Sequence, residues 1–226
     1  MVELVLATSN KNKIAELREL LSEKVDFSFR LLSLADIGIT EDIPEDGTTF
    51  EENAVIKASA AARRGYIALA DDSGLSVNAL GGAPGIFSAR YAGEEHDYEK
   101  NNEKLLLEMT GVSDRSASFV CVMALVIPKA RDIVIPTELA DRGDLDALAD
   151  VRSSRDVDVF TVRGEVTGEI LEKRTGHSGF GYDPLFFVPD AKKSFAEMTP
   201  DEKNQNSHRG RAVEKMAKLL NAVFAG

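Results

Sequence analysis

Strand-like segments alternate with helix-like segments along this chain, and this alternation restricts the possible folds more than any other feature. Residues 2–7 are apolar and partly β-branched, and Ile14, Leu17 and Leu21 then recur at the spacing of one helix face. Residues 27–32 predict a second strand. Strands that alternate with helices form α/β proteins, so we expect a central sheet flanked by helices.

The rest of the chain continues this pattern. Helices are predicted over residues 48–65 and 98–109 and from two starts near Thr199 and Ser207, and strands over residues 67–70, 118–127, 157–162 and 165–171. The polar sequence at residues 71–74 is expected to end the third strand abruptly. Because the later strands follow one another directly, we expect a mixed sheet.

The charge of the chain excludes two classes of partner. Its 27 Lys and Arg residues against 38 Asp and Glu residues give a formal net charge of −11. Polynucleotides and anionic membranes are bound mainly through Lys and Arg, so we expect neither as a partner. The single cysteine, Cys121, excludes an intramolecular disulfide, and residues 1–7 lack the features of a signal peptide. The expected location is therefore the cytoplasm.

A polar segment joins the first strand to the first helix. Its residues are Thr8, Ser9, Asn10, Lys11, Asn12 and Lys13. Free N–H groups, hydroxyls and lysines meet at such a helix start, which suits a bound phosphate. The segment has neither the Walker pattern nor the glycine pattern of dinucleotide sites. A capped helix with solvated lysines explains the same residues, and both interpretations stay open.

Two adjacent carboxylates, Asp71 and Asp72, follow the apolar residues 67–70. Burial and mutual repulsion make such a pair costly unless a cation or a catalytic arrangement offsets them. Neighbouring side chains on an extended segment point to opposite sides, so one could bind a metal and the other a water molecule. Glu45 and Asp46 could complete an oxygen site suited to magnesium. The alternative is an acidic turn in solvent.

The loop at residues 179–184 places Phe180 and Tyr182 between or beside glycines. This arrangement suits a flat ligand against the backbone, and it suits equally well a tight turn whose aromatic side chains anchor the core. Several basic residues lie near predicted loops or helix starts, and each by itself is typical of a surface charge. They are Lys57, Arg90, Lys203, His208 and Arg209.

Taken together, five segments resemble the Ham1-like, or inosine triphosphate pyrophosphatase, family. They are LVLATSNKNKIAELRELL, EDGTTFEENAVIKA, LADDSGLSVNALGGAPGIFSARYAG, GFGYDPLFFVP and EKNQNSHRGRA. The more distant Maf-like nucleotide pyrophosphatases share the opening motif type but lack the ending Ser207-His208-Arg209. The resemblance implies an elongated α/β fold with a mixed central sheet, two lobes around a central cleft, and a homodimer.

The resemblance also implies roles for particular residues. Asp72 would act as general base, and Glu45, Asp71 and Asp72 would hold Mg²⁺. The residues expected to bind substrate are Thr8, Ser9, Asn10, Lys11, Asn12, Lys13, Lys57, Ser73, Arg90, Phe180, Gly181, Tyr182, Asp183, Lys203, His208 and Arg209.

The activity that the resemblance implies is hydrolysis of deaminated purine nucleoside triphosphates (ITP, dITP and XTP) to the monophosphate and pyrophosphate. Two alternatives stay open, a catalytically inactive nucleotide-binding regulator of the same fold and a Maf-like pyrophosphatase with another base preference. We expect one domain over residues 1–226, with an acidic insertion at about residues 129–156. Residues 132–158 carry eight acidic and three basic side chains, which is typical of a solvated surface loop.

Overall fold

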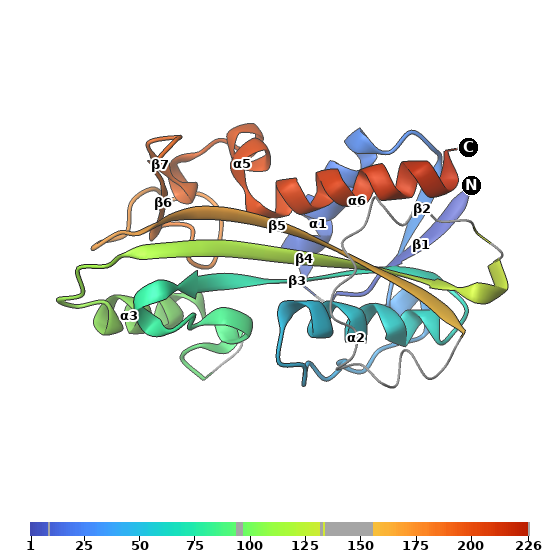
Figure 1. Cartoon of the computed structure of the whole chain (residues 1–226), viewed down its shortest axis with the longest axis horizontal. Coiled ribbons are helices and arrows are strands. Elements are labelled where there is room, and N and C mark those ends of the chain that lie inside the picture. The colour runs from blue at the N-terminus through green and yellow to red at the C-terminus, as the bar shows by residue number, and fades with distance from the viewer. Residues whose placement is uncertain (9, 94–96, 132, 134–155, 226) are drawn as a thin grey trace. The chain divides into compact units, whose positions relative to one another are not determined.

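The computed structural model describes residues 1–8, 10–93, 97–131, 133 and 156–225 as a mixed α/β protein (Figure 1). The strands are β1 (Val2–Leu6), β2 (Phe29–Ser33), β3 (Ile67–Val77), β4 (Ser116–Pro128), β5 (Val157–Ile170), β6 (Phe186–Val188) and β7 (Lys193–Ser194). The α-helices are α1 (Lys11–Lys24), α2 (Phe50–Ala62), α3 (Tyr98–Glu108), α5 (Pro200–Asn206) and α6 (His208–Phe224). Short 3-10 helices are η1 (Ala35–Ile37), η2 (Asn78–Leu80), η3 (Gly85–Arg90), η4 (Lys129–Arg131) and η7 (Phe195–Glu197).

The seven strands form one sheet in the order β2-β1-β3-β4-β5-β6-β7. β1 pairs in parallel with β2 and β3, whereas β6 pairs in antiparallel fashion with β5 and β7. The predicted mixed sheet is therefore confirmed. None of the described helices is long and apolar enough to cross a membrane.

The chain forms two compact units. The first unit comprises Met1–Asp72, Val122–Arg163 and Ala212–Gly226, and the second comprises Ser73–Cys121 and Gly164–Arg211. β3, β4 and β5 each contribute residues to both units. The central cleft that the resemblance implies stays a prediction. Most of the predicted acidic insertion lies outside the described residues.

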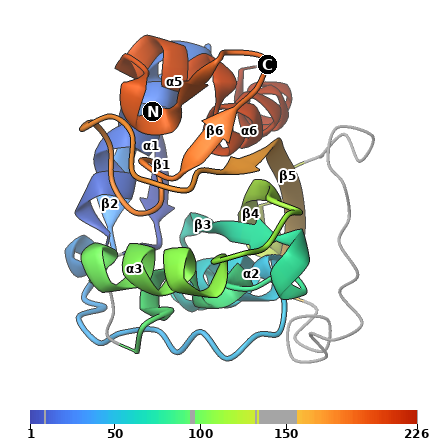
Figure 2. The ribbon, with the colours of Figure 1, turned by 90° about the vertical axis from the view of Figure 1, so that its left-hand side faces the viewer.

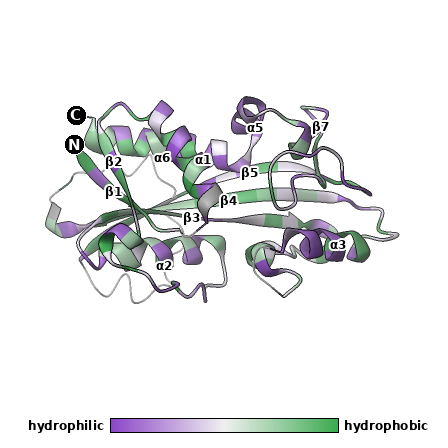
Figure 3. Ribbon diagram, turned by 180° about the vertical axis from the view of Figure 1, so that it is seen from behind, coloured by the Kyte–Doolittle hydropathy of each residue, from purple (hydrophilic) through white to green (hydrophobic). Residues whose placement is uncertain are grey.

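The first unit has helices on both faces of its strands. In Figure 1, α1 and α6 lie on one face and α2 lies on the other. Leu17 and Leu21 of α1 and Val213, Met216 and Leu220 of α6 are all buried, as their helical spacing predicted. Figure 3 shows that α1 and α6 each carry both hydrophobic and hydrophilic residues. Each helix buries its apolar face and leaves the opposite face polar.

The second unit packs aromatic side chains into its core. The ring of Phe119 on β4 lies 4.8 Å from that of Phe186 on β6 and 5.7 Å from that of Phe195 in η7, measured between centroids. Leu105 of α3 joins the same core. Figure 2 shows α3 and α5 on opposite sides of the strands of this unit. Cys121 is fully buried in β4, as expected for a small core residue.

The predicted end of the third strand at Ala70 is wrong. β3 continues through the two carboxylates and on to Val77 without a break. The acidic residues do not end the strand because Asp71 and Asp72 each form an ion pair with a lysine, which offsets the cost of burying them. Sequence patterns alone do not show such long-range pairing.

β5 is one strand where the sequence predicted two. Side chains of α6 contact its backbone around the predicted break. Lys215 Nζ donates a hydrogen bond to the carbonyl of Arg163 (2.8 Å), and Arg211 Nη1 donates to the carbonyl of Glu165 (2.8 Å). The helix therefore satisfies two backbone acceptors in the middle of this strand.

The start of α2 provides a test of helix capping. Thr49 Oγ1 accepts a hydrogen bond from the N–H of Glu52 (3.1 Å). We expect Thr49→Ala to lower the free energy of unfolding by about 1 kcal/mol, because this N–H loses its acceptor. Urea denaturation measures the change, with Thr110→Ala at an exposed position as the control. Equal losses in the two variants would contradict the capping role.

Candidate active site

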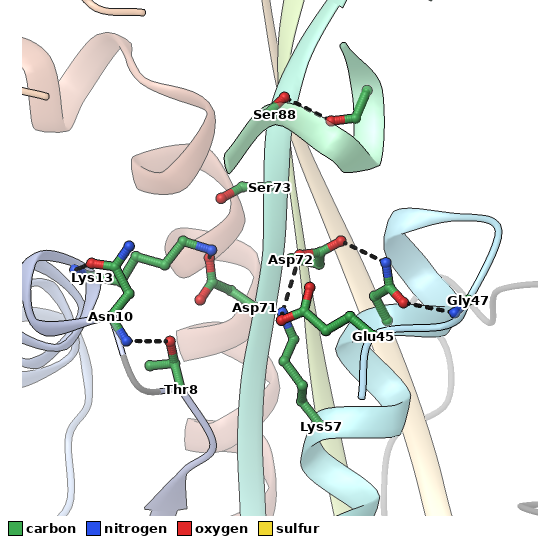
Figure 4. Close-up of polar contacts among 12 residues, drawn as sticks. Thr8, Asn10, Lys13, Glu45, Gly47, Lys57, Asp71, Asp72, Ser73 and Ser88 are labelled. Atoms are coloured by element: carbon green, nitrogen blue, oxygen red, sulfur yellow. Dashed lines mark hydrogen bonds and ion pairs between the residues drawn. The ribbon is translucent and has the colours of Figure 1, made fainter. Parts of the chain in front are cut away.

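β3 carries two adjacent carboxylates that point to opposite sides of the strand (Figure 4). Asp71 is fully buried, and its Oδ2 lies 2.9 Å from Lys13 Nζ. Asp72 is buried as well, and its Oδ1 lies 3.0 Å from Lys57 Nζ. Two separate ion pairs therefore flank the strand, as expected for neighbouring residues of an extended chain.

The polar turn before α1 holds Lys13 in place. Thr8 Oγ1 accepts a hydrogen bond from the N–H of Asn10 (3.2 Å), and Asn10 Oδ1 accepts one from the N–H of Lys13 (3.3 Å). Lys13 then reaches Asp71 from the first turn of the helix. The capped helix start is confirmed, but Lys13 is not a solvated lysine, because it pairs with the buried Asp71. Phosphate binding by this segment stays a prediction.

Lys57 on α2 contacts two carboxylates. Its Nζ lies 3.0 Å from Asp72 Oδ1 and 3.1 Å from Glu45 Oε1. Burial opposes the charge of Lys57, but the attraction of Asp72, Glu45 and Asp71 outweighs burial and raises the pKa of the ammonium group above its ordinary value. Burial also raises the pKa of the Asp72 carboxyl, although the charges of Lys57 and Lys13 act against it.

Asn53 connects the two acidic segments of this site, and its role was not predicted from the sequence. Its Nδ2 donates to Asp72 Oδ2 (3.3 Å), and its Oδ1 accepts from the N–H of Gly47 (2.9 Å), close to Glu45 in the chain. A Cβ on Gly47 would lie 2.7 Å from Asn53 Oδ1, so this close approach favours glycine. A signal was available, because Asn53 and Lys57 are four residues apart on one face of an alanine-rich helix.

We call Lys13, Glu45, Lys57, Asp71 and Asp72 the carboxylate–lysine group. Its carboxylate oxygens are ligands that Mg²⁺ prefers. Glu45 and Asp72 lie near each other, because both contact Lys57 Nζ. Within the described residues, no three His, Cys, Asp or Glu side chains could hold a metal by themselves. Magnesium is commonly bound by one or two carboxylates, with water and phosphate oxygens completing its coordination. A divalent cation bound here would therefore need water or phosphate oxygens to complete its coordination.

A second polar group lies in the second unit, on the loop before β6 and on α5. Asp183 Oδ2 accepts a hydrogen bond from the N–H of Phe180 (2.8 Å) and lies 2.6 Å from Lys203 Nζ. The same Nζ lies 5.1 Å from the centroid of the Phe180 ring. A Cβ on Gly179, whose φ is +79°, would lie 2.1 Å from Asp183 Oδ2. The buried carboxylate thus fixes the loop around Phe180 and requires glycine beside it.

His208 and Arg209 begin α6 and are both buried. The His208 ring stacks on Phe119, with centroids 4.7 Å apart and planes 10° apart. Arg209 Nη2 donates to Ser73 Oγ (3.3 Å), and Arg209 Cζ lies 5.9 Å from the centroid of Phe180. The interpretation of these two residues and of Lys57 as isolated surface charges is therefore wrong. We call Phe180, Asp183, Lys203, His208 and Arg209 the aromatic–basic group.

Arg90, Tyr182 and Gly181, which were also predicted to bind substrate, make other contacts. Arg90 Cζ lies 5.3 Å from the centroid of the half-exposed Phe87 ring. Tyr182 is buried, and its hydroxyl donates to the carbonyl of Ser88 (3.0 Å). The Gly181 carbonyl accepts a hydrogen bond from α3. Lys11 and Asn12 lie in the first turn of α1, and Ser9 lies outside the described residues. Asp46, which was expected to help complete the oxygen site with Glu45, is exposed.

The fold and these two groups define a mixed α/β protein with a buried centre of paired carboxylates and lysines. The chain belongs to the Ham1 family, whose family model matches residues 4–143 and 145–219. It is 44% identical to a dITP/XTP pyrophosphatase of Clostridium perfringens, over 99% of this chain and 100% of that protein. It is 43% identical to a dITP/XTP pyrophosphatase of Bacillus subtilis, over 98% of each chain. The resemblance noted from the sequence is therefore confirmed.

Solved structures agree with this assignment. A HAM1 protein from Coxiella burnetii is 39% identical and has a TM-score of 0.78, over 97% of this chain and 98% of that chain. The Ham1 protein of Staphylococcus aureus is 35% identical and has a TM-score of 0.77, over 96% of this chain and 97% of that chain. The α/β fold predicted from the sequence is thus the fold of the family.

Proposed function

We propose that this protein hydrolyses the triphosphates of deaminated purine nucleosides (ITP, dITP and XTP) to the nucleoside monophosphate and pyrophosphate. The main support for this proposal comes from two ion pairs on β3, between Asp71 and Lys13 and between Asp72 and Lys57. Relatives that match nearly the whole chain bear the name dITP/XTP pyrophosphatase. Lysines and carboxylates together suit phosphoryl transfer, where positioning and charge neutralisation supply most of the catalysis.

In this proposal Asp72 is the general base. A water molecule attacks the α-phosphorus and transfers a proton to the Asp72 carboxylate as the new P–O bond forms. The bond between the α-phosphorus and the bridging oxygen breaks, and pyrophosphate leaves in line with the attack. The raised pKa of Asp72 makes its carboxylate a stronger base than an exposed aspartate.

The charges of the substrate need partners. Lys13 and the capped turn with Thr8 and Asn10 offer one ammonium group and a helix N-terminus to the phosphates. Glu45, Asp71 and Asp72 would hold Mg²⁺, which supplies neutralisation of the phosphate oxygens when bound. Lys13 and Lys57 offset part of the negative charge of these carboxylates in this structure, and a bound cation would add to that compensation.

We assign base recognition to the aromatic–basic group. Phe180 offers a flat apolar face, and Lys203, His208 and Arg209 offer hydrogen-bond donors that suit a 6-oxo group. Adenine carries a 6-amino group instead, so it would leave buried donors without acceptors. Rejection of the wrong base then follows from unpaired polar groups.

Other parts of the assignment rest on the sequence and on the resemblance, and the homodimer rests on the resemblance alone. We propose a homodimer in the cytoplasm, with magnesium as the metal and one domain that carries an acidic insertion. The inactive-regulator alternative would require a damaged carboxylate set, and Glu45, Asp71 and Asp72 are all present and paired with lysines. A Maf-like base preference is disfavoured, because Maf-like proteins lack the segment with His208 and Arg209. Both residues pack in the second unit of this chain.

A pyrophosphate-release assay tests the function and the metal together. We expect release from ITP and XTP with magnesium, and at least about 10-fold slower release from ATP, because a mismatched polar edge commonly costs this factor or more. A chelator in excess should abolish release, and added magnesium should restore it. No release from ITP or XTP with any divalent metal would contradict the proposed function.

A further inference from the structure

Asn102 on α3 is a buried residue whose side-chain amide binds the backbone of a neighbouring loop. Its Nδ2 donates to the carbonyl of Gly181 (2.9 Å). Asn102 is 4% exposed, and its buried Oδ1 has no hydrogen-bond partner among the described residues. A buried acceptor without a partner is destabilising, so stability alone would favour an apolar side chain of similar size here.

The carbonyl that Asn102 holds belongs to the loop of the aromatic–basic group. Gly181 lies between Phe180 and Tyr182, and its φ of +64° is a conformation that favours glycine. Asp183 accepts a hydrogen bond from the N–H of Phe180, and Asn102 donates one to the carbonyl of Gly181, the next residue. The backbone that carries the Phe180 ring is therefore held at two points.

The same face of α3 also contacts the ring. Tyr98 precedes Asn102 by four residues, so the two side chains share one helix face. The Tyr98 ring lies 6.0 Å from the Phe180 ring, measured between centroids. α3 thus supports both the side chain of Phe180 and the peptide that follows it.

Neighbouring contacts hold α3 against this loop. Arg174, which precedes the loop, donates from Nη2 to the carbonyl of Glu99 (3.2 Å). Asn101, the residue before Asn102, donates from its Nδ2 to the carbonyl of Ala89 (3.1 Å). Asn102 therefore lies on a helix that is already anchored, which lets a single hydrogen bond fix the position of Gly181.

We propose that Asn102 is a positioning residue for base recognition, acting through Gly181 on the Phe180 ring. The inference rests on the proposed function, in which the aromatic–basic group discriminates between purines. Asn102 itself touches no atom of the substrate. Its hydrogen bond keeps the ring and the adjacent donors in the arrangement that accepts one base edge and rejects another, and small displacements of such groups are costly for recognition.

The test is Asn102→Leu, which keeps the number of side-chain heavy atoms and removes both the hydrogen bond and the unpaired acceptor. We expect the ratio of kcat/KM for ITP to that for ATP to fall about tenfold, mainly through a higher KM for ITP, while Tm stays the same or rises. Asn78→Ala is the matched control, because the amide of the exposed Asn78 donates to Ser116 Oγ (2.8 Å) in the same unit. It should leave the ratio unchanged.

Each outcome decides the role of Asn102. An unchanged ratio overturns the proposal, and a change in Tm beside it shows that Asn102 has a packing role instead. If Asn102→Leu does not fold, Asn102→Ser takes its place, with the same expected fall in the ratio. If the wild-type protein releases no pyrophosphate from ITP, the proposed function is wrong, and the ratio of the ITP and ATP dissociation constants by calorimetry then decides the role of Asn102 separately.

Discussion

Asp72→Asn should lower the rate of pyrophosphate release from ITP by about 10³-fold, within the range that a general base contributes. The amide has almost the shape of the carboxylate, but it does not accept the proton of the attacking water. Lys57 keeps Glu45 as a partner in the variant, so nucleotide binding should change little. Steady-state kinetics measure the rate, and calorimetry measures ITP binding.

The matched control for this variant is Asp36→Asn. Asp36 lies in the first unit and its carboxylate also accepts hydrogen bonds, from the N–H and hydroxyl of Ser33 (both 2.8 Å), but at an exposed position. Its replacement should leave the rate unchanged. A turnover in Asp72→Asn above about a tenth of the wild-type value would remove the general-base assignment, since a positioned base contributes far more than this.

Lys57→Met should be the most destabilising single change in the carboxylate–lysine group. Methionine fills a similar volume, but it leaves Asp72 buried without its ion-pair partner at 3.0 Å. Removing one member of a buried ion pair costs about 3–5 kcal/mol, because the remaining charge is not compensated. Urea denaturation should show this loss in the free energy of unfolding, and activity should fall as well.

A surface lysine provides the comparison. Lys218 Nζ lies 3.1 Å from Glu214 Oε1 on α6, and both side chains are more than half exposed. Lys218→Met should change the free energy of unfolding by less than about 1 kcal/mol, because solvent screens such a pair. Similar losses in the two methionine variants would show that Lys57 is not needed to compensate buried charge.

Most elements of the fold were predictable because they depend on local patterns. The faces of α1 and α6 follow from leucines and other apolar residues at helical spacing, and the start of α2 follows from its threonine cap. The errors lie where long-range contacts decide the structure. β3 continues past Asp71 because a lysine from another element neutralises that carboxylate, and local sequence does not contain this information.

The residue types of the candidate site were predictable from the sequence, but the hydrogen bonds and ion pairs between its residues were less so. The adjacent carboxylates Asp71 and Asp72 stood out because two charges after an apolar segment require an explanation. Asn53 and Asn102 did not stand out, because asparagine is common on surfaces and only the structure shows these two to be buried. Their roles depend on which backbone groups they contact, Gly47 and Gly181, and those contacts are non-local.

The contacts between α6 and β5 have a consequence for the behaviour of the protein at high concentration. A strand with unsatisfied carbonyls is a template on which a strand from another molecule can add, which leads to aggregation. Lys215 and Arg211 occupy the carbonyls of Arg163 and Glu165. β6 pairs with β5 at Glu169 and Ile170, so these two carbonyls lie outside that pairing. A strand that added to β5 at this point would have to displace two cationic side chains, and α6 therefore opposes such an addition.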